Sequence, residues 1–112
     1  MVTKSGFKID SFRRARGGNS RLLEITCSKC GSCVCHYQKD GPGILKRMYL
    51  DRIFQSEYSG LEGKDLRSIP QFICLICKVH LGIPIVYEKE NRLAFRLFVG
   101  VITKKIIKAN IK

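Results

Sequence analysis

Six cysteines are the residues of this 112-residue chain whose type and spacing could do chemistry. Four of them lie close together in the stretch LEITCSKCGSCVCHYQKDGPG, and the other two follow in FICLICKVHLG. Three chemistries are open to such thiols: disulfides, a metal or metal–sulfur site, and redox catalysis. Two Cys-x-x-Cys pairs favour a metal site, because two such turns supply the four thiolates of a tetrahedral zinc site.

The two Cys-x-x-Cys pairs are the strongest signal in the sequence. A glycine directly after the first pair, Gly31, suits the left-handed backbone that a metal-binding turn needs. Alternatively, the two cysteines of the second pair are small apolar residues of the core, since free cysteine is often buried. With two pairs in one chain we predict a metal site, with zinc as the metal and iron as the alternative. The predicted ligands are Cys27, Cys30, Cys74 and Cys77.

Cys33 and Cys35 do not fit the paired pattern. In an extended strand both side chains point to one face, so they either pack beneath the metal or one of them replaces a ligand. His36 then faces away from both cysteines. His80 becomes a ligand only if a cysteine is spared, and we assign neither histidine a role.

The first cysteines also resemble the beginning of a bacterial ferredoxin run. Here, however, Cys35 follows Cys33 after one residue and no proline comes next, which breaks the [4Fe–4S] pattern. A rubredoxin-like carrier needs only the same four thiolates with iron in place of zinc. An iron or thiol redox protein is therefore the alternative function, although neither pair stands between a predicted strand and helix as in thioredoxin-like enzymes.

The paired knuckles resemble those of zinc-ribbon proteins and of β-tent proteins such as the Yippee family. The 43 residues between Cys30 and Cys74 fit the longer-spaced β-tent class better. The resemblance covers the four cysteines, Gly31 and the surrounding strands. It implies the same four ligands and knuckles at the tips of β-hairpins.

Strand signals surround both pairs. RLLEIT (21–26) and CVCHYQKD (33–40) predict two strands, and a hairpin is predicted from Ile83–Glu88 and Arg92–Val99. VITKKIIK near the end either continues that strand or forms a short helix. The segment 44–72 is mixed, with a loop over 56–68. We therefore predict a mainly β fold, with α+β as the alternative: a small zinc-stabilised antiparallel sheet with two CxxC knuckles and a basic N-terminal arm.

Positive charge is concentrated at the two ends of the chain. The net charge is +12; residues 1–21 contain six Lys or Arg against one Asp, and residues 104–112 contain four Lys. The predicted division is a basic flexible arm at 1–20 and a single zinc-binding β-rich domain at 21–112. We expect the basic ends to bind nucleic acid, RNA or DNA, although solubility alone is an alternative. The predicted contacts are Arg13, Arg14, Arg16, Arg21, Lys104 and Lys105, with Phe7, Phe12 and Tyr37 as stacking groups.

The remaining features of the sequence concern location and function class. No apolar run is long enough to cross a membrane, and the first residues do not read as a secretory signal, so we predict a cytoplasmic protein whose cysteines bind metal. Four thiolates close a zinc site, and no HExxH arrangement supplies a general base, which favours a non-enzymatic role. A zinc-binding module that engages nucleic acid is the favoured function, and a protein partner is also compatible.

Overall fold

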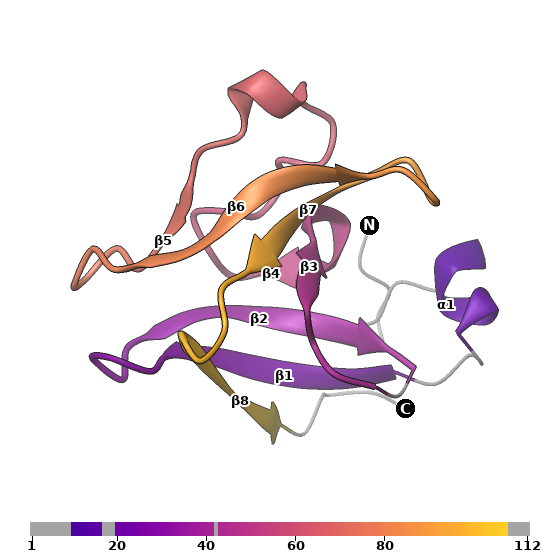
Figure 1. The fold of residues 1–112 in the computed structure, drawn as a ribbon. Helices are drawn as coiled ribbons and strands as arrows, with labels where there is room; N and C mark the ends of the chain where they lie inside the picture. The colour runs from indigo at the N-terminus through magenta and orange to yellow at the C-terminus, as the bar shows by residue number, and fades with distance from the viewer. Residues whose placement is uncertain (1–9, 17–19, 42, 108–112) are drawn as a thin grey trace.

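The structure is a computed structural model that describes residues 10–16, 20–41 and 43–107 of the chain. Two antiparallel sheets form two layers, which confirms the prediction of a mainly β fold (Figure 1). Sheet A has the strand order β4 (Ile53–Phe54), β2 (Cys33–Asp40), β1 (Ser20–Cys27) and β8 (Ile102–Ile107). Sheet B has the order β3 (Arg47–Tyr49), β7 (Arg92–Leu97), β6 (His80–Tyr87) and β5 (Phe72–Ile73). The helical elements are α1 (Ser11–Ala15) and two 3-10 turns, η1 (Leu50–Arg52) and η2 (Leu66–Ser68).

The predicted strands around the first cysteine pair are confirmed as the β1–β2 hairpin. Alternation along β1 buries Leu23, Ile25 and Cys27 and leaves the residues between them partly exposed, as expected for a strand with one face on the core. The second predicted hairpin is also confirmed, as β6 paired with β7 from Gly82↔Leu97 to Tyr87↔Arg92.

The end of the chain and the mixed segment connect the two sheets. After β7 the backbone turns at Gly100, which has a φ of +76°, and β8 then pairs with β1 in sheet A instead of extending sheet B. Within the mixed segment, β3 pairs with β7 in sheet B, and β4 pairs with β2 in sheet A. The chain therefore crosses between the two layers four times, after β2, β3, β4 and β7.

The core between the sheets is aromatic. The rings of Phe72 and Phe95 stack with centroids 4.5 Å apart, and Tyr58 packs edge-on against them at 5.0 and 5.5 Å. The Tyr58 hydroxyl accepts a hydrogen bond from the N–H of Ile73 (3.1 Å) and lies 3.0 Å from its carbonyl oxygen. This contact fixes β5 directly before Cys74.

A set of ion pairs joins the layers at the end of the sheets where β2 and β6 finish. Arg52 is fully buried and pairs with Asp10 (2.6 Å) and Asp40 (2.9 Å), while Arg92 pairs with Asp51 (2.6 Å). Two further bridges run from Glu90 to Arg92 (3.0 Å) and Arg16 (2.8 Å). We call these seven residues the charge network: Asp10, Arg16, Asp40, Asp51, Arg52, Glu90 and Arg92.

The charge network includes residues from the predicted N-terminal arm. Helix α1 begins after Asp10, whose carboxylate accepts the Arg13 N–H at 3.1 Å, and both Asp10 and Arg16 contact the domain. Residues 1–9 and 17–19 lie outside the described residues, so the flexibility of the arm stays a prediction. Among the helices that the structure describes, none has the length and apolar character to cross a membrane.

Candidate metal centre

Two turns of the same geometry carry the predicted ligands. In the first, the Cys27 N–H donates to the Ser32 carbonyl (2.9 Å), and the Gly31 N–H donates to the Cys27 carbonyl (2.8 Å). In the second, Cys74 and Lys78 repeat both hydrogen bonds at the same distances, with the Val79 carbonyl as the acceptor of the first. We call these turns the first knuckle (27–32) and the second knuckle (74–79).

The left-handed residue after each cysteine pair makes this turn possible. Gly31 has a φ of +78°, as the sequence predicts for a knuckle. Lys78 holds the equivalent position with a φ of +69°. This left-handed backbone conformation is unfavourable for any residue that has a Cβ atom. The second knuckle therefore keeps the same geometry in spite of its sequence, which indicates that its shape is required.

The two knuckles bring the four predicted ligands together, which we call the cysteine tetrad. The Sγ atoms of Cys27 and Cys77 are 3.6 Å apart, as are those of Cys30 and Cys74, and all four lie within 4.8 Å of one another. A tetrahedral zinc site with Zn–S bonds of about 2.3 Å has sulfur–sulfur edges of roughly 3.8 Å. The tetrad is therefore already close to the size that a bound metal requires.

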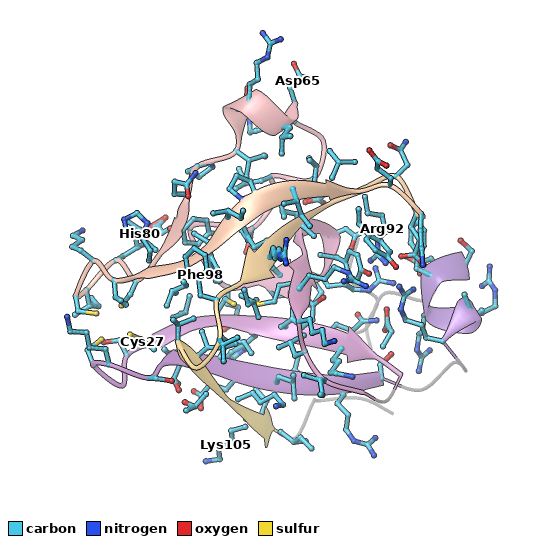
Figure 2. All side chains as sticks on the ribbon, viewed as in Figure 1. Cys27, Asp65, His80, Arg92, Phe98 and Lys105 are labelled. Atoms are coloured by element: carbon cyan, nitrogen blue, oxygen red, sulfur yellow. The ribbon has the colours of Figure 1, made fainter. Side chains whose placement is uncertain are left out.

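The position of the tetrad follows from the two hairpins. The first knuckle is the tip of β1–β2 in sheet A, and the second is the tip of β5–β6 in sheet B (Figure 1). Cys27 and Cys74 are each 1% exposed, whereas Cys30 is exposed. In Figure 2 the sulfurs gather near Cys27, where the ends of the two layers approach each other. A metal at this point would join the sheets.

Hydrogen bonds and crowding set the protonation of the thiols. The hydroxyl and backbone N–H of Ser32 lower the pKa of Cys30 to about 6, so its thiolate prevails at neutral pH. The Cys77 N–H lowers the pKa of Cys74. At Cys77 the Val79 N–H also favours the thiolate, but burial and the neighbouring sulfurs outweigh it and raise the pKa to about 11. A divalent cation would relieve this opposition by stabilising all four thiolates together.

Cys33 and Cys35 lie outside the tetrad, and the prediction that they share a face is wrong. Cys35 is buried in the core and Cys33 is exposed. The reason is a β-bulge in β2. The adjacent β1 residues Ile25 and Thr26 pair with Cys35 and Cys33 respectively, so two residues of β1 stand opposite three residues of β2. The extra residue of β2 turns Cys33 to the opposite side.

The same bulge overturns the prediction that His36 faces away from both cysteines. A ring nitrogen of His36, the Cys33 Sγ and a carboxylate oxygen of Glu24 all lie within 4.8 Å of one another. His80 is exposed at the start of β6 and is not part of the tetrad. Sequence reasoning missed Glu24 in this position, because the bulge has no signal in the residue types.

The basic residues predicted to contact nucleic acid separate into different environments. Arg16 is engaged by Glu90 and by the Tyr49 hydroxyl (3.2 Å), and the Arg13 Nε donates to Ser20 (2.9 Å). Arg14 is exposed on α1. Lys104 and Lys105 are both exposed, but as consecutive residues of β8 they point to opposite faces of sheet A. The six residues therefore do not form one surface.

Two of these six residues share a groove with a lysine that sequence reasoning missed. Arg21, Lys39 and Lys104 come from β1, β2 and β8 and line a surface groove of about 870 Å³, which we call the basic groove. Partial burial, followed by the positive charges of Lys104 and Arg16, lowers the pKa of Lys39. Lys39 could have been found from the strand pattern, because Arg21 is its cross-strand partner.

The aromatic residues predicted to stack on bases are not available in the described part of the chain. Tyr37 is 2% exposed, and its hydroxyl accepts the Tyr49 N–H at 2.9 Å inside the core. Phe12 packs under the Arg92 guanidinium, 4.0 Å from its centre. Phe7 lies outside the described residues.

The chain was compared with known proteins at three levels. No protein-family model, no curated protein and no solved structure matches it. Its functional assignment therefore rests on its own residues, of which the clearest arrangement is a cysteine tetrad that could hold a metal ion.

Proposed function

We propose that this protein is a structural zinc module that binds nucleic acid through its basic groove, in the cytoplasm. The observation that carries the zinc assignment is the tetrad, formed by two knuckles with the same hydrogen bonds and with paired sulfurs 3.6 Å apart. Four thiolates are a common ligand set of structural zinc, and they leave no position for a substrate. The knuckle pattern, the longer spacing and the two-layer arrangement support the resemblance to β-tent proteins.

The location of the tetrad supports a structural role for the metal. Each sheet contributes one hairpin tip, so the bound ion would cross-link the two layers at this end. Iron fits the same four thiolates, and the metal analysis at the end of the Discussion separates the two. A redox function of the Cys33–Cys35 pair is less well supported, because burial raises the pKa of both thiols, that of Cys35 to about 12.

The basic groove supports nucleic acid as the ligand. Three strands each contribute one cation, and partial burial together with the positive charges of Lys104 and Arg16 lowers the pKa of Lys39. The Lys39 ammonium donates to the Gly41 carbonyl (2.8 Å), which holds it at the wall of the groove. A phosphate backbone would neutralise these charges and release its counterions, which gives binding that depends on salt and little on sequence.

Charge-matched variants test the groove. The triple variant Arg21→Gln/Lys39→Gln/Lys104→Gln removes the groove cations, and the control Lys64→Gln/Arg67→Gln/Lys89→Gln removes three exposed cations elsewhere. We measure the anisotropy of labelled single-stranded RNA and DNA as salt is varied. The groove variant should lower the slope of log K against log salt by roughly 2 to 3, corresponding to three phosphate contacts. If both triple variants lower the salt slope equally, nucleic acid does not bind in the basic groove, and the attraction is non-specific.

A further inference from the structure

We propose a second metal site on the outer face of sheet A, formed by Glu24 of β1 with Cys33 and His36 of β2. A carboxylate oxygen, a thiol sulfur and an imidazole nitrogen from these residues lie within 4.8 Å of one another. The site shares no residue with the cysteine tetrad. It therefore goes beyond the proposed function and does not depend on it.

The bulge in β2 creates this site. Cys33 and His36 are three residues apart, and in a regular strand such residues point to opposite faces. One extra residue, Val34, stands opposite the Ile25–Thr26 step of β1, so that Cys33 is turned to the face of His36. Bulges are over-represented next to functional sites, where they redirect a side chain in this way.

The pairing of β1 and β2 fixes the rest of the geometry. Glu24 and His36 are direct cross-strand partners, so their side chains lie side by side on the ladder. Both are half-buried, whereas Cys33 is exposed. The two half-buried ligands are held by the sheet, and the thiol faces solvent.

The ligand set selects the class of metal. Thiolate, imidazole and carboxylate are the three ligand types that zinc binds in proteins, and three protein ligands leave a fourth position open. Calcium and magnesium are disfavoured, because they require mainly oxygen ligands. The site therefore fits zinc or a similar transition metal with an exchangeable fourth ligand, in contrast to the closed tetrad.

A neighbouring lysine tunes this site. Lys105 of β8 is the cross-strand partner of Glu24 on its other side, so its side chain leaves the sheet on the same face as the carboxylate ligand. Its positive charge repels a bound cation and lowers the affinity. The site should consequently bind metal more weakly than the tetrad, and removal of this charge should strengthen it.

Cobalt provides a direct test on the full chain with its tetrad already filled by zinc. Addition of cobalt should produce a visible thiolate-to-cobalt band, and bound cobalt should protect Cys33 from alkylation. His36→Ala should weaken binding by more than about 100-fold, since loss of a mere supporting residue around a metal already costs 10- to 100-fold. Glu24→Gln should weaken it less, and Lys105→Gln should strengthen it by about two- to tenfold.

Matched variants decide the outcome. His80→Ala removes the exposed histidine of β6 and should leave cobalt binding unchanged, and Cys33→Ser should abolish the thiolate band while the fold is retained. The proposal is overturned if no thiolate band develops at micromolar cobalt. It is equally overturned if His36→Ala and His80→Ala bind cobalt with the affinity of the wild type.

Discussion

The two sheets are joined at both ends, but by different chemistry. At one end the cysteine tetrad links the tips of β1–β2 and β5–β6. At the other end the charge network links β2 of sheet A, through η1, to β7 of sheet B and to helix α1. Figure 2 shows this separation, with Cys27 and Arg92 on opposite sides of the molecule.

The difference shows how a small β domain holds its layers without a large core. The tetrad is complete only with a metal, whereas the charge network pairs its own carboxylates and guanidinium groups. Among the described residues, the buried Nη1 of Arg52 still has no hydrogen-bond partner. Removal of a metal or of one thiol should therefore open the first end as a unit. The second end has several bridges, so single changes should weaken it in steps.

The largest effect is expected at the tetrad. Cys27→Ser or Cys74→Ser should lower the free energy of unfolding by more than about 4 kcal/mol, or prevent folding, because metal binding is coupled to folding. The two variants should behave alike, since each removes one ligand from one knuckle. Urea unfolding followed by circular dichroism measures this.

The control for the tetrad is the buried cysteine that lies outside it. Cys35→Ala removes a similar sulfur from the core and should cost only about 1 to 2 kcal/mol. If Cys35→Ala unfolds the protein as completely as Cys27→Ser does, the assignment of four ligands is wrong.

An intermediate effect is expected at the charge network. Asp40→Ala removes a nearly buried carboxylate from Arg52, and the guanidinium keeps Asp10 and a longer contact with Asp51. We expect a loss of about 3 kcal/mol, near the lower limit for breaking a buried pair. Asp65→Ala, at an exposed aspartate on the far loop in Figure 2, should change stability by less than about 0.5 kcal/mol. Equal losses in these two variants would exclude the network as a link between the sheets.

Acid should weaken the charge network through Asp10. Burial acts to raise the pKa of Asp10, but hydrogen bonds from Arg52 and the Arg13 N–H outweigh it and lower the pKa from 3.8 to about 2. Because the folded pKa lies below the unfolded one, the stabilisation is complete above about pH 4 and is lost as the pH falls towards 2.

Comparison of the wild type with Asp10→Asn separates the effect of the Asp10 carboxylate from the protonation of the thiolates. The wild type should exceed Asp10→Asn in stability at neutral pH, and the difference should shrink below about pH 4. Urea unfolding of both proteins, from neutral pH down to the lowest pH at which both still retain zinc, gives the difference, in which the acid sensitivity of the tetrad cancels. A difference that does not change with pH would contradict the role of the Asp10 carboxylate.

The smallest effect distinguishes the two knuckles. Lys78→Gly should stabilise the protein by up to about 1 kcal/mol, because glycine adopts the left-handed backbone without strain. Gly31→Ala, at the equivalent position, should destabilise by a similar amount. Thermal unfolding of the two variants checks the opposite signs, and a loss of stability in Lys78→Gly would show that the lysine side chain has another role.

The sequence predicts the parts of this structure that depend on short stretches of chain. Two Cys-x-x-Cys pairs identify all four residues of the tetrad, because each turn is defined by its own few residues. The strands beside the first pair and the β6–β7 hairpin follow in the same way from local apolar alternation.

The parts that sequence reasoning missed depend on contacts between distant residues or on a change of register. The pairing of Asp10 with Arg52 crosses 42 positions, and nothing local indicates which carboxylate a given arginine meets. The bulge beside Cys33 shifts side chains between faces without any marker such as glycine. Similarly, β8 is predicted as strand or helix, but its partner β1 is set by the turn at Gly100.

The metal content of the full chain tests the central claim most directly. The protein is purified without added metal, dialysed against a weak chelator to clear loosely held ions, and examined by elemental analysis and absorbance. We expect one zinc per chain, no visible absorption, and unfolding when a strong chelator removes the zinc. A chain that is folded and free of metal would contradict a structural metal in the tetrad, and bound iron with visible absorption would contradict zinc as the metal.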